Sequence, residues 1–375
     1  MKLLLALNAF KGTLTASEAS TIIHELFTRE LPSVQVKTQD IADGGDGTCA
    51  LLIDALGIEK VPCLSLNALG KPVAGFYGWE EHTKTAYLDV STCSGLSTLA
   101  NEERNPRIAS TYGTGILVQA AISRGAEKIV LGLGGSASID LGIGILQALG
   151  YQFLDAQGRE LSSFSADILK KCKHIQGPIR VPRLSFLCLA DVTSCFFGED
   201  GAIPVFGPQK GLKYSEMDVF TQEAHSFIDL LSSKSRKKVS DQPGFGAAGG
   251  IAYGLSYFFP LQLEVGATYF FEKVGMLEKI KNADFILTGE GKYDSQSKHG
   301  KGSHILLRLA RQEGKKIGLI SSGKEGKEDF DFLLQLPEVD LANLNAKKIA
   351  TKNLSKVLSK AIAKGVFTPK GYTRI

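Results

Sequence analysis

Short apolar runs alternate with amphipathic stretches at the start of the chain. Residues 2–7 are almost wholly apolar and predict a buried strand, and residues 34–39 alternate in the manner of a second strand. Between them, Thr15 and Glu18 have the capping-box spacing that marks the start of a helix. Residues 49–56 predict another helix. This β-α-β-α order with short loops is typical of a parallel sheet.

The pattern changes in the middle of the chain. Residues 61–66, 73–79 and 85–90 are short alternating runs, which predict a meander of strands and not further βαβ units. Near residue 281 the β-α-β pattern returns. Residues 339–343 then predict a last strand and residues 354–363 a last helix.

These two patterns predict a discontinuous domain organisation. We expect an α/β fold in which one open domain is built from both chain ends, residues 1–66 and 281–375, and a second, mixed α/β domain, residues 67–280, is inserted in it. The length of 375 residues agrees with two domains, because a single core seldom grows so large.

Composition narrows the class of protein. A hydrophobic content of 43% and a charged content of 22% are typical of a soluble globular protein. The net charge is 43 − 39 = +4, and the basic residues are mostly scattered, which gives little support to nucleic-acid binding. The six cysteines include no C-x-x-C pair, so neither a zinc ribbon nor a redox motif is indicated. No apolar run reaches the roughly 18 residues of a transmembrane helix, and we expect a cytoplasmic protein, either a monomer or a homodimer.

Polar residues and glycines follow the predicted strands. Such loops begin at Asn8, Asp43, Gly134, Asp191 and Gly289. In open α/β sheets, ligands bind outside the carboxyl ends of the strands. The shared position of these loops therefore indicates a ligand site more strongly than any one of them does alone.

The loop of residues 42–48 places Asp43 and Asp46 in a turn with three glycines, at 44, 45 and 47. Glycines allow a sharp turn and a close approach of the backbone to a ligand. Carboxylates on such a turn can bind a hard cation or accept a proton. An ordinary turn between a strand and a helix is the alternative, because Asp and Gly are favoured there as well.

Further loops suggest an anion site. Gly134, Gly135 and Ser136 come between a predicted strand and a predicted helix, where free backbone N–H groups and a helix dipole favour phosphate; a close-packed turn is the alternative. Asp191 ends another buried strand and can equally be a capping residue. Neither a Walker-type nor a Rossmann glycine motif is present.

The remaining candidates are Glu290, between two glycines after a buried strand, and Lys11 in the first loop. Lysine pairs well with phosphate or carboxylate, although a lone loop lysine is commonly solvent-exposed. Carboxylates, glycine-rich loops and loop lysines without a histidine pair favour phosphoryl transfer, which needs positioning, charge neutralisation by Mg²⁺ and a carboxylate to accept a hydroxyl proton.

On these segments the chain resembles the bacterial glycerate kinases that phosphorylate D-glycerate with ATP. Residues 42–48 are similar to the family's A-D-G-G-E-G-T motif, with Asp46 in place of Glu. The other matching segments occur in the family's order: Phe10-Lys11-Gly12-Thr13-Leu14, Arg104-Asn105-Pro106, residues 111–115, residues 134–140, Val205-Phe206-Gly207-Pro208-Gln209-Lys210-Gly211, residues 246–250, residues 288–291 and Asp294.

The resemblance implies two α/β domains, a flavodoxin-like one from both chain ends and an inserted one. It also implies an ATP- and Mg²⁺-dependent kinase for glycerate, with 2-phosphoglycerate a more frequent product than 3-phosphoglycerate. On this basis we expect Asp191 to be the general base, with Lys11 catalytic and substrate-binding. The nucleotide would bind at Gly134, Gly135, Ser136 and Lys210, the substrate at Asp43 and Glu290, and Mg²⁺ at Asp43 and Asp46.

The chain also departs from the family pattern. Asn8 stands where an Asp is common, Ser138-Ile139 replaces Thr-Asn, and residues 191–195 depart from Asp-Val-x-Asn-Pro. Ile139 removes an amide that could contact a ligand. Two alternatives therefore stay open: a kinase for another small hydroxy acid or sugar acid, and a non-catalytic protein that binds an organic acid.

Overall fold

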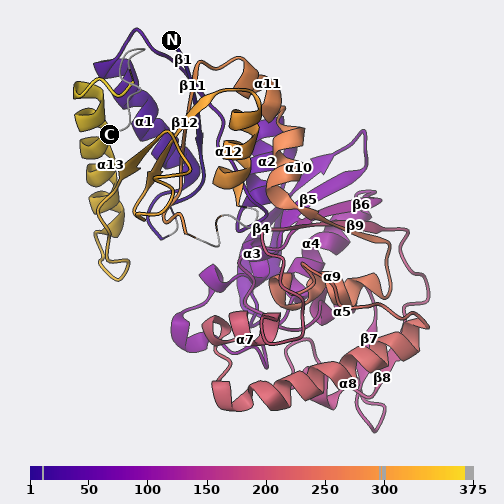
Figure 1. Ribbon diagram of the computed structural model, residues 1–375. Coiled ribbons are helices and arrows are strands. Elements are labelled where there is room, and N and C mark those ends of the chain that lie inside the picture. The colour runs from indigo at the N-terminus through magenta and orange to yellow at the C-terminus, as the bar shows by residue number, and fades with distance from the viewer. Residues whose placement is uncertain (11, 295–296, 298–300, 368–375) are drawn as a thin grey trace. The chain divides into compact units, whose positions relative to one another are not determined.

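The computed structural model describes residues 1–10, 12–294, 297 and 301–367. The chain forms two compact units (Figure 1). Unit 1 comprises Met1–Asp43 and Ala267–Ile375, and unit 2 comprises Gly44–Gly266. The α/β class and the building of one sheet from both chain ends, both predicted from the sequence, are confirmed.

Unit 1 is built on a five-stranded parallel sheet with the order β13-β12-β11-β1-β2. Its strands are β1 (Lys2–Leu7), β2 (Gln35–Thr38), β11 (Phe285–Gly289), β12 (Lys316–Ser321) and β13 (Phe332–Gln335). From β1 the chain continues to β2 on one side, whereas β11 continues to β12 on the other. The strand order therefore reverses between β1 and β11, which makes this the topological switch point of the sheet.

Helices cover both faces of this sheet. They are α1 (Ala16–Glu30), α10 (Gly266–Lys273), α11 (Met276–Lys281), α12 (Gly302–Gln312) and α13 (Ala346–Ala363). The Thr15–Glu18 capping box forms as predicted and starts α1. In Figure 1, α1 and α13 lie side by side on one face of the sheet and α12 covers the other. Leu3, Phe27, Phe285 and Leu354 join the first face and its helices in one core.

The last strand of unit 1 lies earlier in the chain than the sequence pattern predicts. Residues 339–343 form no strand, so that prediction is wrong, and β13 takes the edge position by pairing with β12. Leu341 instead packs close to Gly12, where an added Cβ would meet the leucine side chain. The pairing with β12 therefore selects residues 332–335 as the edge strand.

Unit 2 is built on a six-stranded mixed sheet with the order β10-β9-β6-β5-β4-β3. The predicted meander is present as antiparallel pairs β3–β4 and β4–β5, while β5, β6, β9 and β10 run parallel. Two further strands form a separate small sheet. The strands of unit 2 are β3 (Glu59–Leu66), β4 (Pro72–Glu80), β5 (Thr85–Asp89), β6 (Lys128–Gly132), β7 (Gln152–Leu154), β8 (His174–Gln176), β9 (Ser185–Ala190) and β10 (Leu261–Val265).

The helices of unit 2 pack around this sheet. They are α2 (Thr48–Leu56), α3 (Val90–Ser94), α4 (Tyr112–Ser123), α5 (Ile143–Ala148), α6 (Ile168–Lys171), α7 (Ala202–Phe206), α8 (Met217–Ser235) and α9 (Ile251–Ser256), with short 3₁₀ turns at Leu96–Thr98, Asn101–Glu103, Pro208–Lys210, Tyr214–Glu216 and Ala247–Gly249. Leu131, Leu146, Phe186, Phe227 and Leu255 represent the single large core that these elements share.

The division into units differs from the expected domain bounds. The sequence pattern placed the boundaries after residues 66 and 280, whereas the units divide between Asp43 and Gly44 and between Gly266 and Ala267. The reason is packing within unit 2: β3 pairs along its whole length with β4, the next strand, and α2 contacts β5 and β4.

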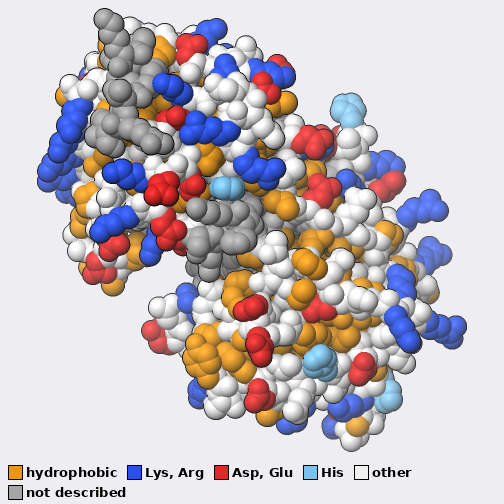
Figure 2. All heavy atoms as spheres, viewed as in Figure 1, with side chains coloured by type: hydrophobic (Ala, Val, Ile, Leu, Met, Phe, Trp, Pro, Cys, Tyr) orange, Lys and Arg blue, Asp and Glu red, His pale blue; other side chains and the backbone are white. Residues whose placement is uncertain are grey.

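Two general properties complete the description. Over the described part of the chain, we find no helix with the length and hydropathy that a membrane span requires. Figure 2 shows acidic and basic side chains interspersed over the visible face of the protein.

Close packing of α4 against β3 depends on Gly113. A Cβ at this position would come within 3.0 Å of the carbonyl oxygen of Leu66, and the Ser65 hydroxyl donates to the Gly113 carbonyl at 2.7 Å. We expect Gly113→Ala to lower the free energy of unfolding by about 2–3 kcal/mol, because backbone cannot give way cheaply. Urea unfolding followed by circular dichroism measures this.

Gly177→Ala is the matched control, since the nearest atom to its added Cβ, in Tyr151, is 3.8 Å away and its φ is not positive. We expect that variant to unfold within about 0.5 kcal/mol of the parent. An equal loss in both variants would refute the packing argument.

Candidate active site

The switch point of the unit 1 sheet carries a group of polar side chains. Asn8 follows β1, Glu290 follows β11, and Asp43 lies beyond β2. The backbone N–H of Asn8 donates to the Gly289 carbonyl at 2.8 Å, which ties the two central loops together. Asn8 Nδ2 donates to Oδ2 of the buried Asp43, also at 2.8 Å. The amide at position 8 therefore orients a carboxylate that an Asp there would repel.

Glu290 is a buried acid, only 4% exposed. Ser297 Oγ donates to its Oε2 at 3.3 Å, and Lys301 Nζ lies 3.7 Å from the same oxygen. Burial raises the pKa of Glu290 to about 7, and the Asp43 charge acts in the same direction, whereas Lys301 opposes it. The buried Ser303 side chain faces Glu290 and lowers its pKa, although Glu290 Oε1 and Ser303 Oγ make no hydrogen bond of normal geometry within the described residues. A carboxyl group poised near neutral pH is suited to bind a donor or to exchange a proton.

Lysine 11 cannot be placed in this group. It was predicted to be a catalytic and substrate-binding residue, and it lies outside the described residues. Around it, Phe10 and Leu14 form a closed turn, with the Phe10 N–H donating to the Leu14 carbonyl at 2.9 Å. Lys301, which the sequence did not single out, is the cation that the structure places beside Glu290.

The carboxyl edge of the unit 2 sheet is shaped by close backbone contacts. A Cβ at Gly44 would come within 3.0 Å of the Ala190 carbonyl at the end of β9. One at Gly134, just after β6, would come equally close to the backbone of Gly45 and Asp46. Only glycine permits these approaches, so three loops of unit 2 that are far apart in sequence lie against one another.

The loop of residues 42–48 is divided between the units. The boundary falls between Asp43 and Gly44, so Asp43 belongs to unit 1 and Asp46 to unit 2. Asp46 is exposed, and its carboxylate lies near Gly135, since an added Cβ there would be 3.2 Å from Asp46 Oδ2. The structure holds no group of three or more His, Cys, Asp or Glu side chains that could bind a metal, within the residues it describes.

Behind Asp46 lies Asp89, a buried acid at the end of β5. Its two oxygens accept from the backbone N–H groups of Cys49 and Ala50, each at 3.0 Å. Asp89, which is distant in sequence, therefore caps the N-terminus of α2. Burial raises the pKa of Asp89 to about 7, and the Asp46 charge contributes. The first N–H groups of α2 are thus already used within the protein.

The turn after β6 is joined to Lys210. Ser136 is buried, and Lys210 Nζ donates to its Oγ at 2.7 Å and to the Ser138 carbonyl at 2.8 Å. Burial lowers the pKa of Lys210 to about 7, and the nearby Asp140 opposes that shift. Lys210 therefore contacts the turn directly. From the sequence, the two could be connected only through the resemblance to the family.

A helix does not follow this turn directly, so that part of the sequence interpretation is wrong. The chain continues in irregular form to α5, which starts at Ile143. The buried Asp140 accepts from the N–H groups of Gly142 and Gly144 and from Thr111. Because Asp140 occupies the start of α5, the anion-binding potential of the turn rests on its own backbone and on Ser136, without a helix dipole.

Asp191 follows β9, as predicted, and is half-buried. Its backbone N–H lies beside Gly44, because an added Cβ there would be 3.0 Å from Asp191 N. Ile139 is buried in the core of unit 2, with 1% of its surface exposed. Ile139, which stands where the family pattern has Asn, is therefore a buried apolar side chain.

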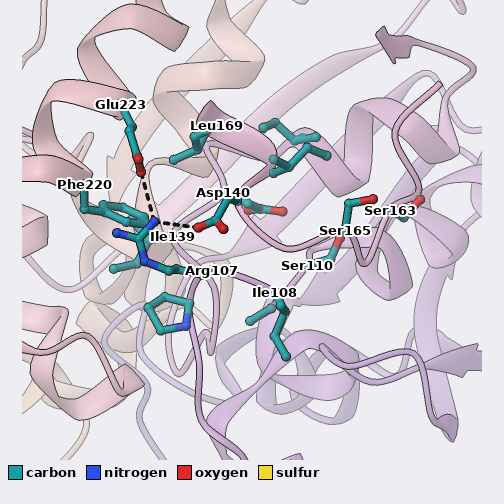
Figure 3. Close-up of a pocket in the computed structure, with 15 residues that line it drawn as sticks. Arg107, Ile108, Ser110, Ile139, Asp140, Ser163, Ser165, Leu169, Phe220 and Glu223 are labelled. Atoms are coloured by element: carbon teal, nitrogen blue, oxygen red, sulfur yellow. Dashed lines mark hydrogen bonds and ion pairs between the residues drawn. The ribbon is translucent and has the colours of Figure 1, made fainter. Parts of the chain in front are cut away.

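One cavity in unit 2 adjoins the segment after β6, because Ile139 and Asp140 are among the residues that line it. Figure 3 shows Arg107 directed toward Glu223, at 3.0 Å, and the same guanidinium bonds Asp167 at 2.6 Å. The cavity volume is about 10 Å³, room for roughly one water molecule. Arg107 is held between acidic side chains and packs over Phe220, which is a structural arrangement.

Several polar residues of these two edges escaped sequence reasoning, namely Asp89, Lys301 and Ser303. Asp191 and Glu290 were identified because each carboxylate follows a buried strand. Asp89 also lies at the end of a buried strand, but it was overlooked because it stands inside the apolar run of residues 85–90. Lys301 precedes α12, and its closeness to Glu290 depends on tertiary structure alone.

Comparison with known proteins assigns the family. The model of the glycerate kinase family matches residues 3–361 of the chain. The chain belongs to this family. Similar members include glycerate kinase of Haemophilus influenzae, which is 35% identical over 89% of this chain and 88% of its own length, and glycerate 2-kinase of Escherichia coli, 34% identical over 84% of each.

The fold agrees with the family as well. A crystal structure from Salmonella typhimurium, of a protein assigned as glycerate kinase 2, is similar with a TM-score of 0.80 and 29% identity, covering 98% of this chain and 99% of that one. Membership of a kinase family implies the use of ATP and of a small-molecule substrate. The resemblance found in the sequence motifs is thereby confirmed.

The raised pKa of Glu290 predicts a pH dependence of stability. Between its ordinary pKa of 4.5 and its folded value of about 7, the folded state keeps a proton that the unfolded chain has released. The free energy of unfolding should therefore fall as pH rises through this window, by on the order of 3 kcal/mol for this group. Glu290→Gln should lose that contribution to the slope.

Denaturant unfolding of both proteins at pH 4.5, 6 and 8 measures the effect. Glu325→Gln, a change of an exposed glutamate in the same unit, is the control and should keep the parent's pH dependence. Parallel pH profiles for the parent and Glu290→Gln would contradict the assignment of the raised pKa.

Proposed function

We propose that the protein transfers the γ-phosphoryl group of ATP to a hydroxyl of D-glycerate. The observation that carries this proposal is the match to the glycerate kinase family over residues 3–361. Both units support it, because each presents ionisable or anion-binding groups at the carboxyl ends of its parallel strands, where α/β proteins bind ligands. The name of the Escherichia coli relative, glycerate 2-kinase, favours 2-phosphoglycerate over 3-phosphoglycerate as product.

The unit 2 edge is the proposed nucleotide site. Gly134 and Gly135 bring backbone close to a ligand, and Ser136 offers a hydroxyl beside the buried Lys210. Asp191, at the end of the adjacent strand, is the proposed general base that accepts the proton of the attacking hydroxyl.

The unit 1 group is the proposed substrate site. The carboxyl groups of Asp43 and Glu290 can accept hydrogen bonds from the hydroxyls of a hydroxy acid, and the amide of Asn8 orients the first of them. A cation must neutralise the substrate's own carboxylate, which is the role we propose for Lys11.

Magnesium ion fits the donor set. Mg²⁺ is commonly bound through one or two carboxylates together with phosphates and water, and the exposed Asp46 beside Gly135 offers such a carboxylate. Asp43 is the second proposed ligand. When bound, the ion would neutralise phosphate charge during transfer.

The structure weakens one alternative. A kinase for a different acid was suggested by Ile139, yet that side chain is 1% exposed and packs in the core of unit 2, beside a cavity with room for roughly one water molecule. A coupled assay of ATP consumption with D-glycerate, L-glycerate, lactate and gluconate tests both alternatives. We expect kcat/KM to be highest for D-glycerate by at least about tenfold, and phosphorus NMR then locates the phosphate.

Two results would refute the proposal. A clear preference for another acid would favour the different kinase, and ligand-induced stabilisation by D-glycerate without phosphoryl transfer would favour a binding protein.

Replacing the proposed base gives a sharper prediction. We expect Asp191→Asn to lower kcat by about 10²-fold or more with little change in unfolding, since the half-exposed carboxylate is removed without a change of shape. Asp200→Asn, an exposed carboxylate on the same connection, is the control and should retain parental turnover. Near-parental kcat in Asp191→Asn would remove Asp191 from this role.

A further inference from the structure

Lys210 is an ammonium group inside unit 2. It is 3% exposed, and its two hydrogen bonds go to Ser136 Oγ and to the carbonyl of Ser138. The charge of Asp140 acts on it, and the oxygens of Asp140 accept hydrogen bonds from Thr111, Gly142 and Gly144. A buried lysine with these partners is directed at the turn and does not extend into solvent.

The chemistry of an ammonium group fixes the direction of the Ser136 hydroxyl. A protonated lysine only donates, so Ser136 Oγ must accept from it. The hydroxyl proton is then left for a third group, and no residue within the described part of the chain accepts it. A hydroxyl polarised in this way is a directed donor, and bonds of that kind to a charged oxygen are among the stronger ones.

The position of Ser136 indicates what the donor meets. It follows Gly134 and Gly135 at the carboxyl end of β6. Gly135 has a left-handed backbone conformation, with a φ of +71°, and this conformation forms the turn. Asp140 occupies the N–H groups at the start of α5, so the turn can offer an anion only its own backbone and this hydroxyl.

We propose that the Ser136 hydroxyl donates a hydrogen bond to a phosphate oxygen of the bound nucleotide, and that Lys210 is a positioning residue that acts through Ser136 without contacting the nucleotide. This inference rests on the proposed function, since it requires ATP at the unit 2 edge. Burial, which lowers the pKa of Lys210 to about 7, makes its charged form dependent on nearby anions, and a phosphate would favour that form.

A double-mutant cycle on the full-length protein tests the proposal. The variants are Ser136→Ala, Lys210→Met and the double variant, and the measurements are KM for ATP and for D-glycerate, kcat, and calorimetric binding of a non-hydrolysable ATP analogue. We expect each single change to raise KM for ATP and the Kd of the analogue by roughly 10- to 100-fold, with KM for glycerate near the parental value. The double variant should lose little more than the more affected single one, because the two residues act in series.

Ser138→Ala is the matched control. It removes a buried hydroxyl that has no partner among the described residues and keeps the carbonyl to which Lys210 donates. We expect its affinity for the analogue to equal that of the parent. If Lys210→Met does not fold, Lys210→Gln keeps an N–H donor without the charge, and Ser136→Thr keeps the hydroxyl; the latter should retain affinity where Ser136→Ala loses it.

The outcomes separate this inference from the proposed function. Independent losses that multiply in the double variant, or a rise of KM for glycerate with KM for ATP unchanged, would overturn the inference while leaving the kinase intact. A parent protein that neither binds the analogue nor phosphorylates any acid would overturn the proposed function itself.

Discussion

The arrangement of the carboxyl edge of unit 2 depends on close backbone contacts at two glycines. Gly44 lies against the end of β9, and Gly134 lies against Gly45 and Asp46, in both cases closer than a side chain would allow. Through these two approaches, the glycine loop before α2, the turn after β6 and the loop after β9 form one surface. Asp46, Ser136 and Asp191 hold their places on that surface because no Cβ separates the loops.

Each unit also keeps an ionisable group out of water. Glu290 in unit 1 has one oxygen that makes no hydrogen bond of normal geometry within the described residues, and Lys210 in unit 2 donates hydrogen bonds to a hydroxyl and a carbonyl. Burial of a charge is costly unless it is paired, and in both cases the pKa is shifted to about 7. Groups of this kind gain most from a ligand that completes their contacts, which is why they are expected at sites of binding and proton transfer.

Sequence patterns were sufficient where the signal was local. The capping box at Thr15, the meander of the middle region and the carboxylate Glu290 after a buried strand could all be predicted from neighbouring residues. Other features could not be predicted from local patterns. β3 belongs with β4 in unit 2 although the sequence pattern assigned it to the first domain, and at the start of α5 the N–H of Gly144 donates to Asp140. Asp89 was missed because its role is to cap a helix 40 residues earlier in the chain.

The central claim is that the nucleotide phosphates bind to the glycine turn of unit 2, while the carboxyl groups of unit 1 serve the acid substrate. A crystal structure of the protein with Mg²⁺ and a non-hydrolysable ATP analogue tests this most directly. We predict that the triphosphate lies against Gly134, Gly135 and the Ser136 hydroxyl, with Lys210 behind the serine. A triphosphate bound instead among Asp43, Glu290 and Lys301 would contradict the account.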